Sequence, residues 1–242
     1  MTKFGLVGYP LSHSFSKKFF EDKFKREGLS DNSYSLFPLT TIQSLPQLLL
    51  DEVELKGLNV TIPYKESVIP FLNELDAYVK VIGAVNCIKI TNGYLKGYNT
   101  DAPAFEQSLK GFLTLEPEQT FVLGTGGSAK AVVYALKKLG ISYLHVSRTP
   151  TNNQIPYSDI SGNLKSINLF VNTTPLGMFP AVEGYPDIPY HLLTSNDFLF
   201  DLVYNPDETA FLGLGREKGA SIKNGLEMLH LQAEKSWEIW NS

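Results

Sequence analysis

The sequence predicts an α/β protein of two domains, and three observations carry this prediction. Residues 120–149 read in order as a strand, a glycine turn, a helix and a second strand. Roughly the first hundred residues also alternate strand-like and helix-like segments, which is typical of a second α/β domain. A length of 242 residues with 43% hydrophobic content is sufficient for two modest domains with separate cores.

Short hydrophobic runs bounded by turn residues predict the strands of the first domain. We expect strands at residues 3–7, 33–36, 57–62, 85–90 and 94–98. The last two flank Asn92-Gly93, a dipeptide typical of a two-residue hairpin turn. The first domain should therefore contain a sheet that includes a hairpin.

Helix signals separate these strands. Ser14 or Ser16 is placed to cap a helix that runs through three phenylalanines toward Gly28, and a second helix is expected at about residues 42–50. Pro63 is typical of a first helical turn and predicts a helix that carries Lys65 and continues to about residue 72. The chain enters a further helix at residues 99–101.

The segment that begins at residue 120 predicts a dinucleotide-binding unit. Residues 121–123 form a short buried-strand run, and the pattern Gly124-x-Gly126-x-x-Ala129 lets the backbone turn tightly and approach a pyrophosphate. A helix opens directly behind this loop, so its N-terminal amides face the phosphates, and Gly140 stands where a C-terminal cap belongs. A plain structural turn is the alternative interpretation, but the strand and helix that flank the loop favour the nucleotide site.

The end of the second strand of this unit indicates which dinucleotide binds. An NAD site normally places an acidic residue here to bind the ribose hydroxyls, whereas this chain has Ser147-Arg148-Thr149. A guanidinium beside two hydroxyls can bind a 2′-phosphate that a carboxylate would repel. The sequence therefore favours NADP(H), and the alternative is that Arg148 is only a solvated cation.

The remaining segments complete both domains. Residues 169–171 and 198–203 read as buried strands that continue the parallel sheet of the nucleotide domain. Hydrophobic residues three and four apart from Leu226 to Trp240 predict an amphipathic helix that packs back on the first domain. We expect a substrate domain at 1–101, an NADP domain at 102–217, a returning helix within 218–242, and a cleft between the two domains.

Composition excludes several classes of protein. A net charge of −4 without a basic run argues against a nucleic-acid partner, and no apolar run is long enough to span a bilayer. The N-terminus lacks a signal-peptide pattern, so we expect a cytoplasmic protein. A single cysteine, Cys87, fits a reducing compartment and is expected in the core, and the four scattered histidines suggest no metal site.

Polar residues concentrate at the predicted strand ends, where they supply hydroxyls, amides and one cation. The set consists of Ser14, Ser16, Asn59, Thr61, Lys65, Asn86, Asn99, Thr100, Asp101, Tyr204 and Gln232. Each hydroxyl of a bound substrate needs donors and acceptors when it leaves water. This inventory suits a small polyhydroxylated substrate.

Several motifs span nearly the whole chain. Besides the glycine loop they are Ser14-Phe-Ser16, NVTIPYK ending at Lys65, GAVN ending at Asn86, GYNTD ending at Asp101, NTTPLGM ending at Met178, DLVY ending at Tyr204, and NGLEMLHLQ ending at Gln232. Together these motifs resemble those of the shikimate dehydrogenase family. The resemblance implies NADPH-dependent reduction of 3-dehydroshikimate to shikimate, on the pathway to chorismate and aromatic amino acids, by a monomer or homodimer.

The resemblance also implies a role for each matching residue. Ser14 and Ser16 would bind the substrate carboxylate, and Lys65 and Asp101 would form the catalytic pair. The ring hydroxyls would contact Asn59, Thr61, Asn86, Asp101 and Gln232, with Tyr204 also at the substrate. On the cofactor, Gly124, Thr125, Gly126, Gly127 and Ser128 would hold the pyrophosphate, Ser147, Arg148 and Thr149 the adenosine end, and Met178, Leu202 and Gly225 would lie near the nicotinamide.

The chemistry of Lys65 agrees with that role, because reduction of a ketone leaves an alkoxide that needs a proton. A position in a first helical turn would disfavour the charged ammonium, and Asp101 would favour it. The alternatives are an ordinary exposed lysine and a helix-capping aspartate.

Two departures from the family pattern have consequences. Ala102-Pro103-Ala104 follows Asp101 where glycines are usual, and we expect the carboxylate to keep its place. Residues 150–161 hold two prolines and two asparagines in place of a helix with a second basic residue, which predicts a shortened domain in which Arg148 alone serves the 2′-phosphate. A quinate or mixed quinate/shikimate dehydrogenase and a non-catalytic nucleotide or metabolite sensor remain alternatives.

Overall fold

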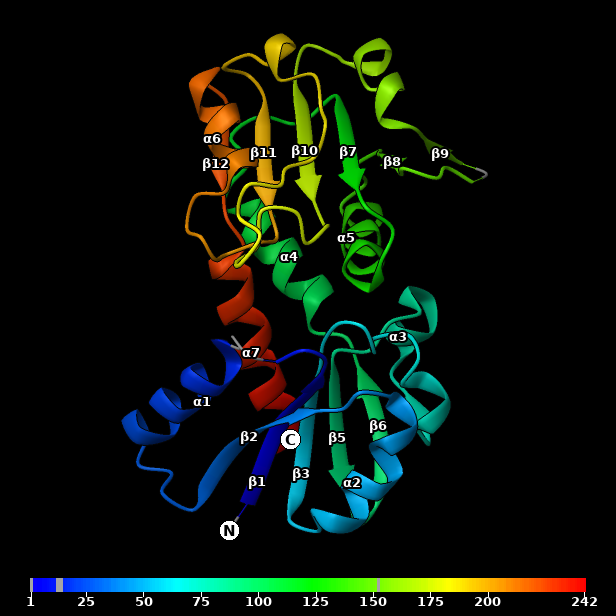
Figure 1. Cartoon of the computed structure of the whole chain (residues 1–242), viewed down its shortest axis with the longest axis vertical. Helices are drawn as coiled ribbons and strands as arrows, with labels where there is room; N and C mark the ends of the chain where they lie inside the picture. The colour runs from blue at the N-terminus through cyan, green and yellow to red at the C-terminus, as the bar shows by residue number, and fades with distance from the viewer. Residues whose placement is uncertain (1, 12–14, 152) are drawn as a thin grey trace. The chain divides into compact units, whose positions relative to one another are not determined.

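The computed structural model describes residues 2–11, 15–151 and 153–242, and the chain divides into two compact units (Figure 1). The first unit comprises the chain up to Thr100 together with His230–Ser242, and the second comprises Asp101–Leu229. Each unit has its own six-stranded sheet. The mixed α/β fold expected from the sequence is confirmed.

The sheet of the first unit is mixed, with strand order β2-β1-β3-β5-β6-β4. Strand β1 pairs in parallel with β2 and β3, β5 pairs antiparallel with β3, and β5 and β6 form an antiparallel hairpin. The turn of this hairpin has positive φ at Asn92 (51°) and Gly93 (79°), as a type I′ turn requires. The strands are β1 (Thr2–Gly8), β2 (Asn32–Pro38), β3 (Leu55–Val60), β4 (Glu74–Leu75), β5 (Cys87–Thr91) and β6 (Tyr94–Tyr98).

Two cores cover the two faces of this sheet, because alternate strand residues point to opposite sides. One core contains Leu58 and Val60 and receives side chains from α2 (Leu45–Asp51) and α3 (Ala77–Ile82). The other is aromatic and joins β1 and β2 to α1 (Phe15–Arg26) and α7 (Leu226–Asn241). Helix α7 thus returns to the first sheet, as the sequence predicted.

Trp240 packs α7 against strands β1 and β5. Its ring stacks on Phe4 with centroids 4.8 Å apart, and its indole N–H donates to the Ile88 carbonyl at 3.0 Å. A Cβ at Gly57 would lie 2.3 Å from the indole nitrogen, so only glycine leaves room for the ring against β3.

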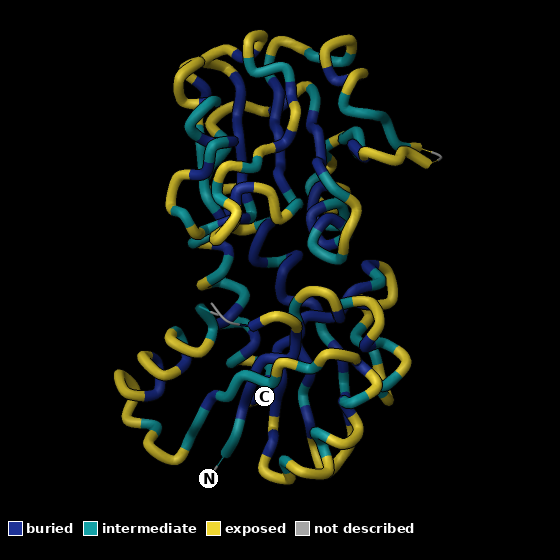
Figure 2. The backbone as a smooth tube through the Cα atoms, in the orientation of Figure 1, coloured by how far each residue is buried: buried dark blue, intermediate teal, exposed yellow. Residues whose placement is uncertain are grey.

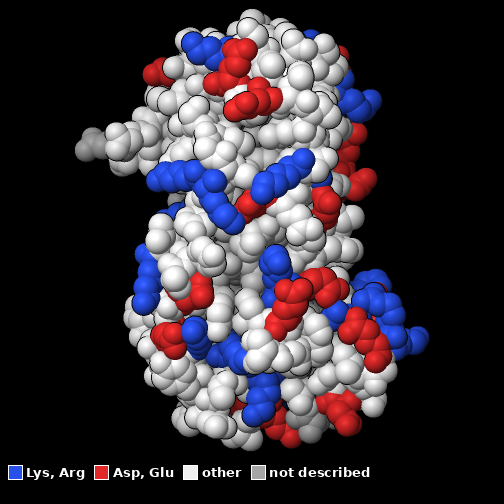
Figure 3. All heavy atoms as spheres, turned by 180° about the vertical axis from the view of Figure 1, so that it is seen from behind, with Lys and Arg blue, Asp and Glu red and all other residues white. Residues whose placement is uncertain are grey.

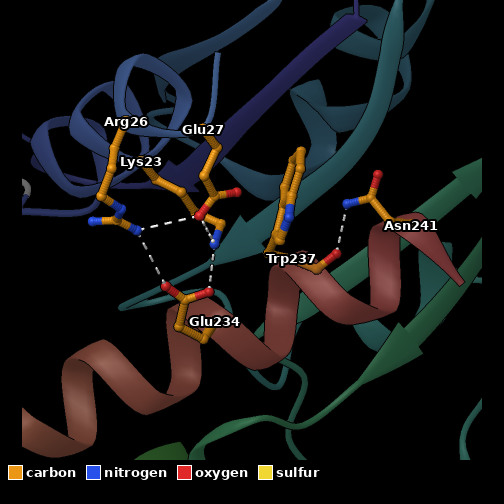
Figure 4. A network of polar contacts seen from close by, with 6 residues as sticks. All are labelled: Lys23, Arg26, Glu27, Glu234, Trp237 and Asn241. Carbon is orange, nitrogen blue, oxygen red and sulfur yellow. Dashed lines mark hydrogen bonds and ion pairs between the residues drawn. The ribbon is translucent and has the colours of Figure 1, made fainter. Parts of the chain in front are cut away.

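A buried cation joins α1 to α7 (Figure 4). The Lys23 ammonium donates to Glu234 at 2.7 Å and to Glu27 at 2.8 Å, and it lies 5.8 Å from the centre of the Trp237 ring. Burial lowers the pKa of Lys23, but the hydrogen bonds to Glu234 and Glu27 outweigh it, so the pKa lies above its ordinary value. The Lys23–Glu234 ion pair therefore links the two helices that cover one face of the first sheet.

The helix expected to begin at Pro63 is absent, and that prediction was wrong. Lys65 lies in a series of turns that leads to a 3₁₀ helix at Ile69–Phe71. The Lys65 carbonyl accepts the Val85 N–H at 2.7 Å, so it is not available for a helical hydrogen bond. In addition, Pro70 has no N–H to donate to the Glu66 carbonyl. The backbone of Lys65 is therefore held beside the entrance to β5. Because Lys65 does not lie in a first helical turn, the helix dipole expected to disfavour its charged ammonium is absent.

The sheet of the second unit is parallel throughout, with strand order β12-β11-β10-β7-β8-β9. Figure 2 shows that the central strands are buried along their length. Its strands are β7 (Gln119–Leu123), β8 (Leu144–Val146), β9 (Gln154–Ile155), β10 (Asn168–Asn172), β11 (Phe198–Asp201) and β12 (Ser221–Lys223), and its helices are α4 (Asp101–Lys110), α5 (Gly127–Lys138) and α6 (Ala210–Glu217).

The chain between β8 and β10 is short. It holds β9 and two 3₁₀ turns at Tyr157–Asp159 and Ser161–Asn163, and Ile160 between these turns belongs to the core. No α-helix occurs within the described residues of this stretch. The prolines and asparagines predicted that a crossover helix would be absent here.

Charged groups are mixed on the surface. On the face shown in Figure 3, lysines and arginines lie among aspartates and glutamates. In the second unit, Glu106 accepts from Lys110 and from Lys138, each at 2.8 Å. No helix among the described residues has both the length and the apolar character needed to cross a membrane.

Candidate functional site

Asn59, near the end of β3, points to the same face of the sheet as α7. It lies between Leu58 and Val60, which face the opposite core, so the alternation of the strand turns its side chain toward the aromatic core. The side chain is 5% exposed, accepts from the Tyr34 hydroxyl at 2.9 Å and donates to the Ser236 hydroxyl at 2.9 Å. Asn59 is therefore held by bonds from β2 and α7.

Asn86 precedes β5 and is held in the same region. Its carbonyl oxygen accepts the Thr100 N–H at 2.7 Å, and its amide donates to the Thr100 hydroxyl at 2.9 Å and to Gln232 Oε1 at 3.5 Å. The side chain is 3% exposed. Thus Asn86 and Gln232, which the sequence analysis assigned to one site, lie together in the first unit.

Two members of this cluster were missed. Tyr34 on β2 and Ser236 on α7 both bond Asn59, and the Ser236 hydroxyl also donates to the Gln232 carbonyl at 2.9 Å. The only sequence signal for Ser236 is its spacing of four residues from Gln232, which puts both on one helix face. Tyr34 carries no such signal, because its partner lies on a different strand.

The other predicted residues of the first unit take these positions. Ser16 is half-buried in the first turn of α1. Thr61 and Lys65 are half-buried and follow β3, with the Thr61 N–H bonded to the Val7 carbonyl at 2.9 Å. Ser14 lies outside the described residues.

Cys87 lies fully buried in this region, in agreement with its expected place in the core. Burial raises the pKa of its thiol to about 12, against hydrogen bonds with Ser236 and Trp240. The thiol therefore stays protonated and unreactive at neutral pH.

The glycine loop of the second unit has the geometry of a phosphate cradle. Gly124 has φ +108°, and a Cβ there would lie 2.8 Å from the Thr173 hydroxyl, so glycine is required. Gly126 is the N-cap of α5 with no side-chain cap bond, and a Cβ there would meet open space. The space beside Gly126 at the α5 N-terminus fits the approach of a pyrophosphate to the loop formed by Thr125, Gly126, Gly127 and Ser128.

The segment after β8 lies beside this loop. The Ser147 hydroxyl accepts the Thr149 N–H at 3.2 Å, and the Ser147 N–H donates to the Ile155 carbonyl at 3.0 Å. These bonds fix the turn that carries Arg148, whose side chain is exposed. No lysine or arginine occurs in the sequence between residues 149 and 164, so Arg148 is the cation available in this segment.

A buried network joins the ends of β10 and β11. The Asp201 carboxyl accepts from Asn172 at 2.9 Å, from the Val203 N–H at 2.9 Å and from the Thr209 hydroxyl at 2.6 Å. The carbonyl oxygen of Asn172 accepts the N–H and the hydroxyl of Thr174 at 3.0 and 2.7 Å. The network holds the loops that carry Met178 and Leu202.

Stability should depend on the protonation of Asp201. Burial raises the pKa of Asp201 from 3.8 to about 6, against three hydrogen-bond donors that favour the ionised form. Between pH 3.8 and about 6 the folded state binds more protons than the unfolded state. The stabilisation that the protonated Asp201 contributes is therefore complete below pH 3.8 and is lost as pH rises through about 6. We expect the free energy of unfolding of the wild type, relative to Asp201→Asn, to fall by on the order of 3 kcal/mol across this window. Urea denaturation of both proteins over a pH series measures it; a difference that does not change with pH contradicts the expectation.

Gly225 packs directly on Leu202. A Cβ at Gly225 would lie 2.2 Å from the Leu202 carbonyl oxygen, a backbone atom that cannot yield without moving the end of β11. We expect Gly225→Ala to lower the free energy of unfolding by about 1–3 kcal/mol. The matched control is Gly111→Ala, whose Cβ would meet its nearest atom at 3.8 Å. Equal denaturation midpoints for the two variants would contradict this account of Gly225.

The last predicted residues lie in the second unit. Asp101 is the first residue of α4 and is 6% exposed, and Pro103 occupies the first turn, so the departure from the family pattern leaves the carboxylate at the helix start. Tyr204 is half-buried just after β11, and Met178 is exposed.

Comparison with known proteins identifies the family of this chain. Residues 6–88 match the model of the shikimate dehydrogenase substrate binding domain. A curated shikimate dehydrogenase (NADP(+)) from Carboxydothermus hydrogenoformans is 39% identical over 98% of this chain and 90% of its own length. The chain belongs to the shikimate dehydrogenase family.

Solved structures of the shikimate dehydrogenase family share the fold. Shikimate dehydrogenase 1 from Peptoclostridium difficile is 34% identical, with a TM-score of 0.89 over 100% of this chain and 92% of that one. Shikimate 5-dehydrogenase from Thermus thermophilus, in complex with NADP(H) and shikimate, is 31% identical, with a TM-score of 0.87 over 99% of this chain and 93% of that one. The parallel sheet of the second unit and the returning helix α7 are thus features of a family fold.

Proposed function

We propose that this chain catalyses the NADPH-dependent, reversible reduction of 3-dehydroshikimate to shikimate, the reaction that leads toward chorismate and aromatic amino acids. The observation that carries the proposal is the joint presence of a polar cluster in the first unit and a glycine loop followed by Arg148 in the second. Family membership over nearly the whole chain supports it.

The first unit and the last helix bind the substrate. Ser14 and Ser16 bind its carboxylate. The ring hydroxyls contact Asn59, Thr61, Asn86, Asp101 and Gln232, with Tyr204 beside the substrate. Hydroxyl and amide groups of this kind replace the water lost by each substrate hydroxyl.

Lys65 and Asp101 carry the proton. Bound NADPH supplies the hydride to the substrate ketone. Lys65 donates a proton to the oxygen that becomes the new hydroxyl, and it takes that proton back in the oxidation direction. Asp101, an acceptor when ionised, orients the ammonium through its charge.

The second unit, over about residues 102–217, binds NADP(H) through its parallel sheet and glycine loop. Gly124, Thr125, Gly126, Gly127 and Ser128 hold the pyrophosphate, and Ser147, Arg148 and Thr149 hold the adenosine 2′-phosphate end. Met178, Leu202 and Gly225 line the nicotinamide region. We further propose a cytoplasmic monomer or homodimer; the free, buried Cys87 is consistent with a reducing compartment.

Steady-state assays in both directions test the proposal. Purified protein is given 3-dehydroshikimate with NADPH, and separately shikimate or quinate with NADP or NAD. The highest kcat/KM is expected for shikimate with NADP. A higher value for quinate would reassign the substrate, and the absence of turnover with any pair, despite measured binding, would favour a sensor.

A further inference from the structure

Ser236 is the residue at which the hydrogen-bond chains of the substrate cluster meet. It is fully buried on α7, and its hydroxyl lies 2.9 Å from Asn59 Nδ2, 2.9 Å from the Gln232 carbonyl and 3.4 Å from the Thr100 hydroxyl. A hydroxyl offers one proton and two lone pairs, so it can bond all three of these partners at once.

The direction of each bond follows from its chemistry. The backbone carbonyl of Gln232, one helical turn earlier, can only accept, so the Ser236 proton goes there. The Asn59 amide can only donate, and the Thr100 hydroxyl then donates as well, because Ser236 has no second proton. Thr100 keeps a lone pair for the Asn86 amide at 2.9 Å.

Two chains therefore converge on one oxygen. One runs from Tyr34 through Asn59 to Ser236, and the other from Asn86 through Thr100 to the same hydroxyl. Together they link β2, β3, the entrance to β5 and the segment at Thr100 to α7. Every member is buried or half-buried, so solvent cannot readily replace a lost bond.

We propose that Ser236 is a positioning residue for shikimate binding. It need not touch the substrate; it fixes the relative positions of Asn59, Asn86 and Gln232, which the proposed function places around the ring hydroxyls. This inference rests on that proposed function and extends it by one residue.

Ser236→Ala tests the proposal by separating KM from kcat. The substitution removes the Ser236 acceptor from the Thr100 hydroxyl and leaves the Asn59 amide only the longer bond to the Asn86 backbone carbonyl at 3.3 Å. We expect the KM and the calorimetric Kd for shikimate to rise about tenfold. The kcat should change by less than about threefold, and the KM for NADP should stay the same, because the second unit lacks this network. A structural role alone would lower the melting temperature and leave the KM for shikimate unchanged when assays are run well below that temperature.

Two further variants complete the design. Ser108→Ala is the matched control: Ser108 is also a fully buried helical serine, but its hydroxyl donates to Glu227 at 2.7 Å in the second unit. It should leave the KM for shikimate unchanged. Thr100→Val removes the neighbouring hydroxyl and should also raise the KM for shikimate. This variant remains informative if Ser236→Ala does not fold. The double variant Ser236→Ala/Thr100→Val should raise this KM by less than the product of the two single effects.

The outcomes separate this proposal from the proposed function. If the wild type turns over shikimate and both Ser236→Ala and Thr100→Val keep its KM, the positioning role is refuted. If the wild type neither turns over nor binds shikimate, the proposed function itself is wrong, and the positioning role for shikimate is wrong with it.

Discussion

Lys65→Ala is expected to lower kcat for shikimate oxidation by about 10²–10⁴-fold, the usual contribution of a positioned general acid-base group. Its Kd for shikimate should stay within about threefold of the wild type, because the proposed site shares substrate binding among several hydroxyl and amide groups. The backbone of Lys65 is bonded to Val85, so a shorter side chain leaves its surroundings in place. Stopped-flow or steady-state rates, together with calorimetric binding of shikimate, measure the two quantities.

Lys56→Ala is the matched control for this change. Lys56 is exposed on β3 of the same unit and is not among the residues proposed for the site. Its kcat should equal that of the wild type. Near-normal turnover by Lys65→Ala would remove Lys65 from the catalytic pair.

Arg148→Ala is expected to raise the KM for NADP by about ten- to a hundredfold, since a charge-assisted hydrogen bond contributes about 1.5–3 kcal/mol. The KM for NAD should change little, because NAD has no 2′-phosphate for the guanidinium to bind. With no other lysine or arginine between residues 149 and 164, the loss should bring the two cofactors close to equal use. Initial rates over a range of NADP and NAD concentrations measure this selectivity.

Arg216→Ala is the control for the loss of an arginine in the second unit. Arg216 is exposed and pairs with Glu208 at 3.0 Å. It should leave both KM values unchanged. If Arg148→Ala kept a strong preference for NADP, the 2′-phosphate would have to be bound by other groups.

The parts of the fold that sequence predicted best are those fixed by local rules. Buried runs gave β7, β10 and β11, and the Asn92-Gly93 dipeptide gave the hairpin whose positive φ angles the structure confirms. Helix α3 was missed although it carries a capping Asp76 and a left-handed Gly83, because it is only six residues long. The two- and three-residue strands β4, β9 and β12 gave no periodic signal for the same reason.

Features that depend on tertiary hydrogen bonds could not be predicted from the sequence. The helix predicted after Pro63 was wrong because the Lys65 carbonyl bonds Val85, a partner 20 residues away. Ser236 was missed because its importance comes from Asn59, which lies 177 residues earlier in the chain. The motif residues were found one by one, but the buried groups that hold them require the folded sheet.

The most direct measurement of the central claim is the formation of NADPH when the purified chain is mixed with shikimate and NADP, followed by absorbance. The account predicts shikimate-dependent turnover that saturates in both substrates. Absence of NADPH formation from a folded protein that binds both shikimate and NADP would contradict it.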